Sequence, residues 1–231
     1  MRRGGCAADM LYYAKGNDMR YIGAIFDQDG LLFDTERIYQ SSWVEAGGLH
    51  GIAVHPDFPK RFCGLSPSAI TAIVREAYPQ LDVDAYCRDA MRMAWDAQLA
   101  QTPEPKKGLL EMLEFCRSHG IRTAIASSST ISVVRHNIES AGVADFFDAI
   151  ATGGEVKHGK PAPDIFLLAA SKIGVDPALC VVFEDAFSGI RGASAAGCRP
   201  VMIPDMVQPT DEIRAICTIY PDLAAATAAF E

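Results

Sequence analysis

The sequence of 231 residues lacks long hydrophobic runs, an excess of basic residues and closely spaced cysteines. No apolar run approaches the length of about 18 residues that a membrane-spanning helix requires, so we predict no membrane span. The 21 basic residues are outnumbered by 29 acidic ones, which gives a net charge of −8 and argues against a nucleic-acid-binding protein. The seven cysteines are scattered without a Cys-x-x-Cys pair, which argues against a disulfide framework or a zinc site and favours a reducing cytoplasm.

Short apolar runs bounded by glycine, proline or polar residues recur along the chain, with helical patterns between them. The runs lie at residues 22–26, 123–126, 149–151, 181–183 and 201–203. The helical patterns stop at glycines such as Gly120, Gly142 and Gly174. This alternation predicts an α/β fold, a Rossmann-like parallel sheet with helices on both faces.

Residues 35–102 have a different pattern, because they contain amphipathic helical patterns and no strand-like run. The predicted helices lie at 38–46, 68–77 and 84–100. The residues that follow, Pro103-Glu104-Pro105-Lys106-Lys107-Gly108, have the composition of a hinge. An all-helical insertion is therefore predicted at 35–102.

The remaining chain divides into a core and a leader. The α/β core is predicted to consist of residues 19–34 and 103–231, on either side of the insertion. Residues 1–18 lack the apolar stretch of a signal peptide, and we expect a disordered leader there.

The most informative segment is an apolar run that leads directly into two aspartates, Asp27 and Asp29. Open α/β sheets place their active sites at the carboxyl ends of strands, which is where both carboxylates fall. Two carboxylates so close repel each other and need a cation or a shared proton, and hard oxygen ligands suit Mg²⁺. The structural alternative is that acidic residues cap the following helix.

Four segments of the chain occur in an informative order. They are Asp27-Gln28-Asp29-Gly30-Leu31-Leu32-Phe33-Asp34-Thr35, Ile125-Ala126-Ser127-Ser128-Ser129, Gly159-Lys160-Pro161-Ala162-Pro163-Asp164 and Val181-Val182-Phe183-Glu184-Asp185. Together they resemble the four motifs of the haloacid dehalogenase superfamily, and the resemblance covers residues 19–204. It implies subfamily IA, in which the helical insertion is a cap domain that closes over the carboxylates and excludes water.

The resemblance implies a role for each catalytic residue. Asp27 is the expected nucleophile, which forms an aspartyl-phosphate, and Asp29 is the expected general acid and base. Ser127 is expected to donate a hydrogen bond to the transferring phosphoryl group, and Lys160 to neutralise its charge. The structural alternative for Asp29 is a turn-forming residue before a glycine.

The same resemblance implies substrate and metal contacts. The backbone amides of Ser128 and Ser129 are expected to bind the phosphate, although this serine run would also cap a helix in any protein. Gly64 and Leu65 belong to a segment that resembles a substrate-specificity loop. The Mg²⁺ ligands are expected to be Asp27, the carbonyl of Asp29, Asp185 and Glu184, the last directly or through water.

Two positions separate phosphatases from mutases in the β-phosphoglucomutase-like branch of the superfamily. Its mutases carry an arginine where this chain has Pro67 and a histidine where it has Tyr39. We therefore predict a Mg²⁺-dependent phosphatase that acts on a small phosphomonoester, a sugar phosphate for instance. The alternatives are a phosphosugar mutase and a non-catalytic phosphate-binding protein, although a degenerate protein would be expected to lose Asp29, Lys160 or Asp185.

The partners follow from these predictions. We expect a small phosphorylated metabolite as the substrate, no nucleic acid, no membrane, a cytoplasmic location and a monomer.

Overall fold

The computed structural model describes residues 12–13 and 20–231, and its centre is a six-stranded parallel sheet. The strands, in the order in which they lie side by side, are β5 (Ala149–Thr152), β4 (Arg122–Ser127), β3 (Gly23–Phe26), β6 (Cys180–Glu184), β7 (Arg199–Met202) and β8 (Thr218–Ile219). Because β3 lies in the middle, its carboxyl end is flanked by those of β4 and β6. The predicted Rossmann-like α/β fold is confirmed.

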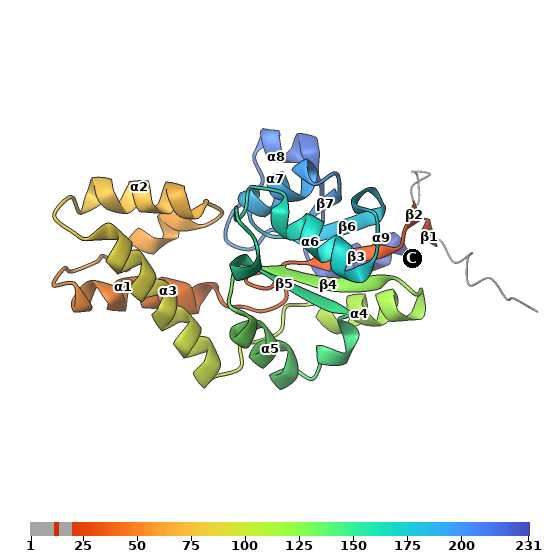
Figure 1. Ribbon diagram of the computed structural model, residues 1–231, viewed down its shortest axis with the longest axis horizontal. Helices are drawn as coiled ribbons and strands as arrows, with labels where there is room; N and C mark the ends of the chain where they lie inside the picture. The colour runs from red at the N-terminus through yellow and green to blue at the C-terminus, as the bar shows by residue number, and fades with distance from the viewer. Residues whose placement is uncertain (1–11, 14–19) are drawn as a thin grey trace, which may run out of the picture.

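Helices cover both faces of this sheet (Figure 1). These are α4 (Leu109–Ser118), α5 (Ile131–Ser140), α6 (Asp164–Ile173), α7 (Phe187–Ala195), α8 (Asp211–Ile216) and α9 (Leu223–Phe230). The other three helices, α1 (Glu36–Leu49), α2 (Pro67–Ala77) and α3 (Val83–Ala100), lie beyond the sheet. Short 3₁₀ helices lie at Phe58–Phe62, Ala144–Phe146, Gly153–Glu155 and Pro177–Leu179.

The alternation of side chains along β3 produces two separate hydrophobic cores. Ala24 and Phe26 point to the face covered by α4, α5 and α9, whereas Ile25 points to the face covered by α6 and α7. All three side chains are buried, as expected for a central strand of a parallel sheet.

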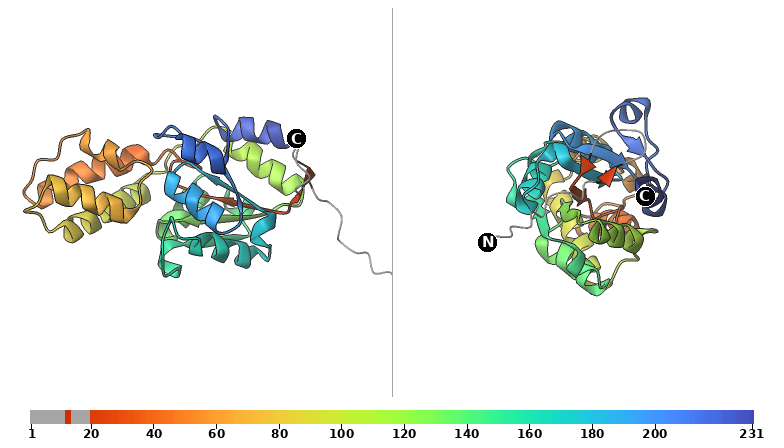
Figure 2. Two further views of the ribbon diagram at one scale, coloured as in Figure 1. Left: turned by 90° about the horizontal axis from the view of Figure 1, so that it is seen from above. Right: turned by 90° about the vertical axis from the view of Figure 1, so that its right-hand side faces the viewer.

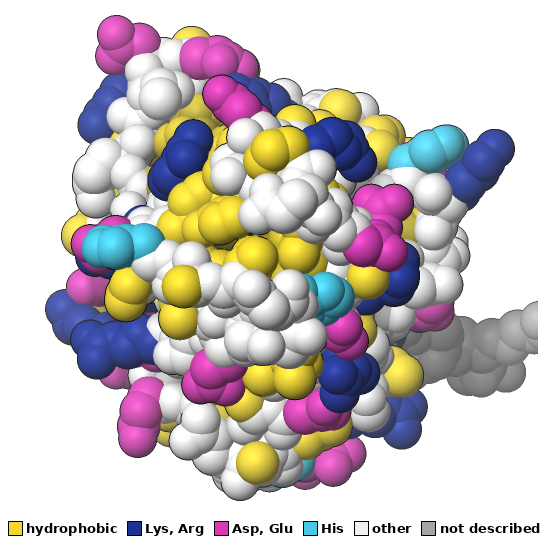
Figure 3. Space-filling model, turned by 90° about the vertical axis from the view of Figure 1, so that its left-hand side faces the viewer, with side chains coloured by type: hydrophobic (Ala, Val, Ile, Leu, Met, Phe, Trp, Pro, Cys, Tyr) yellow, Lys and Arg dark blue, Asp and Glu magenta, His cyan; other side chains and the backbone are white. Residues whose placement is uncertain are grey.

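Helices α1, α2 and α3 form a separate group at one end of the molecule, which we call the helical segment (residues 36–100; Figures 1 and 2). Its own core is built around Trp43, whose ring packs against Phe62 and Tyr86 at centroid distances of 4.9 and 5.5 Å. On the end that faces away from the sheet, apolar side chains gather between charged ones (Figure 3). The helical segment therefore packs around its own hydrophobic core.

Two chain connections join the helical segment to the sheet, and they are hydrogen-bonded to each other. The amide of Asp34 donates to the carbonyl of Glu104 at 2.8 Å, and that of Lys106 donates to Leu32 at 2.9 Å. A buried contact lies nearby, where Asn137 on α5 donates to the Gln98 side chain on α3 at 2.8 Å. Backbone pairing and a buried amide pair thus fix how the two parts meet.

The start of the chain is described only in part. The predicted leader over residues 1–18 lies largely outside the described residues, apart from β1 (Tyr12–Tyr13). This strand pairs antiparallel with β2 (Arg20–Tyr21). Within the described part of the chain, no helix is long and apolar enough to cross a membrane.

A buried hydroxyl in the helical segment gives a test of its stability. Tyr86 is fully buried and donates to the Trp43 carbonyl at 2.6 Å. We expect Tyr86→Phe to lower the free energy of unfolding in urea by about 0.5–1.5 kcal/mol, because the carbonyl loses a buried partner. Tyr78→Phe is the matched control, since the Tyr78 hydroxyl has no hydrogen-bond partner among the described residues. Equal stability of the two variants would contradict the prediction.

Candidate active site

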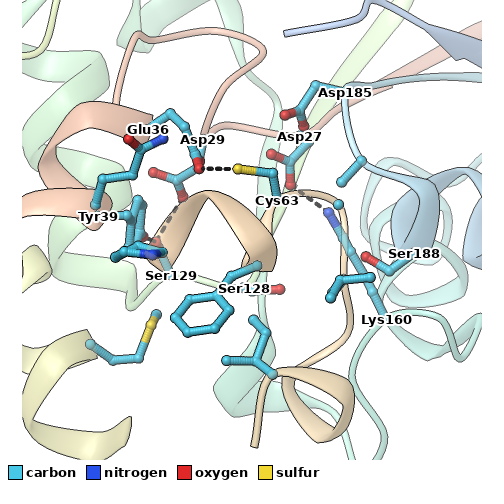
Figure 4. A pocket seen from close by; sticks show the side chains of 18 of the residues that line it. Asp27, Asp29, Glu36, Tyr39, Cys63, Ser128, Ser129, Lys160, Asp185 and Ser188 are labelled. Carbon is cyan, nitrogen blue, oxygen red and sulfur yellow. Dashed lines mark hydrogen bonds and ion pairs between the residues drawn. The ribbon is translucent and has the colours of Figure 1, made fainter. Parts of the chain in front are cut away.

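The parallel sheet brings the predicted catalytic residues together at the carboxyl ends of its central strands (Figure 4). Asp27 follows β3, and its amide donates to Phe183 on β6 at 3.0 Å. Glu184 ends β6 and Asp185 follows it, one strand away from Asp27. Lys160 arrives from the loop that follows β5. Segments separated by more than 150 residues in the sequence therefore contribute to one site.

A buried lysine joins two of these carboxylates. The Nζ atom of Lys160 donates to Asp27 Oδ1 and, at 2.7 Å, to Glu184 Oε1. All three residues are buried, with exposed fractions of 8% or less. Because an unpaired charge at this depth would be strongly unfavourable, each of these groups depends on the others.

Glu184 is held by further contacts. Its second oxygen, Oε2, accepts a hydrogen bond from the amide of Ala186 at 2.7 Å. The carboxylate lies against Gly189 on α7, where even a methyl group would overlap it. Both oxygens of Glu184 therefore have protein partners, which favours a role in orienting Lys160 and an indirect contact with a metal.

The carboxylates affect one another's ionisation. The pKa of Asp27 is raised to about 7, chiefly by burial, with the charge of Lys160 opposing the rise and those of Glu184 and Asp29 adding to it. Burial and the charges of Glu184 and Asp27 raise the pKa of Asp185 well above its ordinary value. Burial opposes the charged form of Lys160, but Asp27 and Glu184 outweigh it and raise the pKa of Lys160. The site therefore contains more negative charge than its lysine neutralises.

Asp29 receives its hydrogen bonds from hydroxyl groups. Oδ2 of Asp29 accepts from Ser129 Oγ at 2.8 Å and from Ser127 Oγ at 3.4 Å. The hydroxyl of Tyr39, on α1 of the helical segment, lies 3.0 Å from Ser129 Oγ. Because the Ser129 proton points to Asp29, Tyr39 must donate to Ser129. The other oxygen, Asp29 Oδ1, is buried and has no partner among the described residues.

The serines do not all lie where the sequence interpretation expects. Ser128 and Ser129 line the cavity described below, whereas Ser127 is fully buried beneath it. The amide of Ser129 donates to Ser127 Oγ at 3.0 Å, so it already has an acceptor. In the structure, Ser127 and Ser129 therefore hold the loop and the Asp29 carboxylate.

A cavity of about 210 Å³ lies between these groups and the helical segment. Gly64 and Leu65, which we predict to contact the substrate, line this cavity. Its apolar wall comes from the helical segment and includes Trp43 and Phe62. Among the described lining residues, Lys160 is the only lysine or arginine. The cavity thus offers one cation beside several carboxylates.

The residues present fit a divalent cation. Asp27, Glu184 and Asp185 each offer a carboxylate oxygen, and these oxygens lie within 4.8 Å of one another. Asp185 makes no hydrogen bond or ion pair with the other described residues, although it lies in this acidic cluster. Hard oxygen donors with uncompensated charge suit Mg²⁺, and Asp27 and Asp185 are the candidates to hold it.

Comparison with known proteins decides the family. The sequence model of the haloacid dehalogenase-like hydrolases matches residues 23–197. The chain belongs to this family of hydrolases. The assignment made from the four motifs is thereby confirmed.

Several relatives of this haloacid dehalogenase-like hydrolase have named activities. Fructose-1-phosphate phosphatase YqaB of Escherichia coli is 36% identical, over 77% of this chain and 94% of the relative. A phosphorylated carbohydrates phosphatase of Thermotoga maritima is 30% identical, over 75% of this chain and 80% of the relative. The crystal structure of a CbbY variant from Rhodobacter sphaeroides, in complex with xylulose-1,5-bisphosphate, superposes with a TM-score of 0.76 over 91% of this chain and 99% of that chain. Its identity of 21% supports a shared fold.

The sequence interpretation of this hydrolase missed two contributions to the site. Tyr39 was considered only as the absence of a histidine, whereas its hydroxyl contacts Ser129. Asp205 was not considered, although it lies close to Gly30 and Asp185. It follows the carboxyl end of β7, so the signal that identified Asp27 could also have identified Asp205.

The raised pKa of Asp27 predicts that cation binding depends on pH. A carboxyl group with a pKa of about 7 is largely protonated at pH 6 and must lose its proton before it can bind a cation. We expect Mg²⁺ to bind more weakly at pH 6 than at pH 8 and to release protons at pH 6. Calorimetric titration in buffers of different ionisation enthalpy measures this proton release. Asp27→Asn is the control, because it removes the proton that Asp27 would release. Heats that do not depend on the buffer would contradict the prediction.

Proposed function

We propose that this hydrolase is a Mg²⁺-dependent phosphatase that acts on small phosphomonoesters, including sugar phosphates, through an aspartyl-phosphate on Asp27. The observation that supports it best is the position of Asp27, which lines the cavity and is paired with Lys160. Asp29 lines the same cavity, and one of its oxygens has no partner among the residues that the structure describes. A nucleophile and a proton donor therefore lie on the wall of one small cavity.

The reaction proceeds in two displacements. A carboxylate oxygen of Asp27 attacks phosphorus, and the bond to the ester oxygen breaks while Asp29 donates a proton to the departing oxygen. Asp29 then takes a proton from water as the water oxygen attacks the phosphorus of the aspartyl-phosphate. The bond between phosphorus and the Asp27 oxygen breaks, which releases inorganic phosphate and restores the Asp27 carboxylate. Lys160 neutralises charge on Asp27 and on the phosphoryl group. Mg²⁺, when bound at Asp27 and Asp185, offsets the negative charge of the phosphoryl group.

The helical segment would act as the cap in this reaction. It supplies the apolar wall of the cavity, including Trp43 and Phe62, and the Tyr39 hydroxyl that contacts Ser129. Closed over the sheet, it would exclude bulk water from the aspartyl-phosphate and keep the Asp29 carboxylate aligned.

The cavity favours substrates with one phosphate group. Lys160 is the only cation among the described lining residues, and it is already shared by Asp27 and Glu184. A second phosphate would meet no lysine or arginine among the described lining residues, whereas Gln40 offers an unpaired side-chain amide to neutral groups. The relatives named for fructose 1-phosphate and phosphorylated carbohydrates support a sugar phosphate.

The mutase alternative finds less support. Structural neighbours include a β-phosphoglucomutase from Clostridium difficile, with a TM-score of 0.72 and 22% identity. This similarity supports a shared fold and does not favour mutase activity. Pro67 is the first residue of α2 and offers no cation, and Tyr39 is hydrogen-bonded to Ser129. A non-catalytic role fits poorly as well, because Asp29, Lys160 and Asp185 are all retained and gathered at one site.

The remaining proposals concern the setting of the enzyme. The six described cysteines form no disulfide, which supports a reducing, cytoplasmic environment. We also propose a monomer, as we expect from the sequence.

Substitution of the nucleophile is the direct test. We expect Asp27→Asn to lower phosphate release from an aryl phosphate in the presence of Mg²⁺ by at least about 10³-fold, because an amide cannot form the acyl phosphate. Asp96→Asn is the control, since Asp96 lies on the exposed side of α3 and pairs with Arg92. Near-normal turnover in Asp27→Asn would refute the assignment.

The fate of the aspartyl-phosphate separates phosphatase from mutase. Incubated with β-glucose 1-phosphate and a bisphosphate primer, the wild type is expected to release inorganic phosphate and to form little glucose 6-phosphate. The double variant Pro67→Arg/Tyr39→His should raise transfer to sugar relative to hydrolysis, because the arginine can bind a second phosphate. Efficient isomerisation by the wild type would favour the mutase.

A further inference from the structure

Asp205 lies at the edge of the acidic cluster and has no role in the reaction described so far. It follows β7 in the loop before α8, and its side chain is 16% exposed. The charge of Asp205 contributes to the raised pKa values of Asp185 and Glu36, which places it within electrostatic reach of both. A further carboxylate in a site already rich in negative charge is unfavourable unless it interacts with a cation.

One oxygen of Asp205 is held by the connection between the helical segment and the sheet. Oδ1 accepts an ion-paired hydrogen bond from Lys106 Nζ at 2.7 Å. Lys106 is itself anchored, because its amide donates to the Leu32 carbonyl. The orientation of the Asp205 carboxylate is therefore set from the hinge side.

The other oxygen faces the metal ligands. Asp205 Oδ2 is buried and has no partner among the described residues. A methyl group on Gly30 would lie 3.4 Å from Asp205 Oδ2 and would overlap Asp185 Oδ2. These two oxygens therefore lie less than about 6 Å apart. A water bound to a cation at Asp185 can reach Asp205 Oδ2 over such a distance, because the cation and its water together bridge the two oxygens.

We propose that Asp205 is a positioning residue of the cation site, whose Oδ2 accepts a hydrogen bond from a water in the hydration shell of Mg²⁺ held by Asp27 and Asp185. Mg²⁺ keeps several of its waters in protein sites, and carboxylates that bind such waters are part of the site. Lys106 fixes the acceptor, so the hinge of the helical segment and the cation site share one ion pair. This inference rests on the proposed cation requirement of the phosphatase.

Calorimetric titration with Mg²⁺, without substrate, tests the inference. Asp205→Asn keeps the shape of the side chain but can replace the free acceptor by an N–H donor, and we expect the dissociation constant to rise about 10-fold or more. Glu36→Gln is the matched control, because it removes a carboxylate charge near the same acidic cluster. An oxygen of Glu36 already accepts a hydrogen bond from Cys63. If Asp205→Asn lowers the affinity for Mg²⁺ no more than Glu36→Gln does, the proposal is overturned, since the removed charge alone would account for the change.

Lys106→Met gives a second and opposite test. If only charge matters, removing a cation near the site should tighten Mg²⁺ binding, whereas loss of the support for Asp205 should weaken it. Weaker binding supports the proposal, and tighter binding overturns the part assigned to Lys106. This variant keeps the inference testable should Asp205→Asn fail to fold, which thermal unfolding in chelator would reveal.

The outcome is independent of the phosphatase assay. A wild type that binds Mg²⁺, an Asp205→Asn variant that binds it weakly and no phosphate release from any phosphomonoester would refute the proposed function and support the role of Asp205. Phosphate release by the wild type with equal Mg²⁺ affinity in both proteins would refute the role of Asp205 alone.

Discussion

The buried contact of Lys160 with Asp27 and Glu184 is the interaction on which the rest of the site depends. A lysine buried to this degree is stable only with carboxylate partners, and two carboxylates on neighbouring strands provide them. One positive charge between two negative ones leaves an excess of negative charge, and the nearby Asp185 increases this excess. The same contact that stabilises the lysine therefore leaves the site negative, and this explains why the geometry suits a divalent cation.

The helical segment contributes a hydrogen bond to the site as well as part of the cavity wall. The Tyr39 hydroxyl contacts Ser129, which in turn donates to Asp29 Oδ2. Asp29 Oδ1 has no partner within the part of the chain that the structure describes. Donors gathered on one oxygen of a carboxylate leave the other as the site for a transferable proton. In the proposed reaction, alignment of Asp29 as proton donor and exclusion of water would thus both follow from the position of one group of helices.

The sequence predicted the elements whose signals are local. The runs at 22–26 and 181–183 are found as β3 and β6, because a buried parallel strand consists of consecutive apolar residues. The family and fold class are confirmed, whereas the roles of the individual site residues stay predictions. Strand β8 has two partly buried residues, too few for a pattern, and was not predicted.

Contacts between distant residues could not be predicted from local patterns. The serine run at 127–129 fitted both a phosphate loop and a helix cap, and the sequence does not show that Ser129 contacts Asp29. The orientations of the Asp29 and Asp205 carboxylates, each with one unpaired oxygen among the described residues, depend on the packing of segments about 100 residues apart in the chain. A pattern identifies which residues lie at a strand end, but hydrogen-bond partners depend on the side chains that arrive from elsewhere.

Gly189 shows how a residue without a side chain can belong to an active site. The Glu184 carboxylate occupies the volume that any larger residue at this position would fill. A shift of Glu184 would in turn release Lys160 from one of its two partners. Variation at position 189 is therefore constrained by the ionisation of a lysine on another loop, and a scan of chemically reactive residues alone would overlook this constraint. In redesign of the candidate substrate cavity, this position belongs with the proposed catalytic residues that are kept fixed.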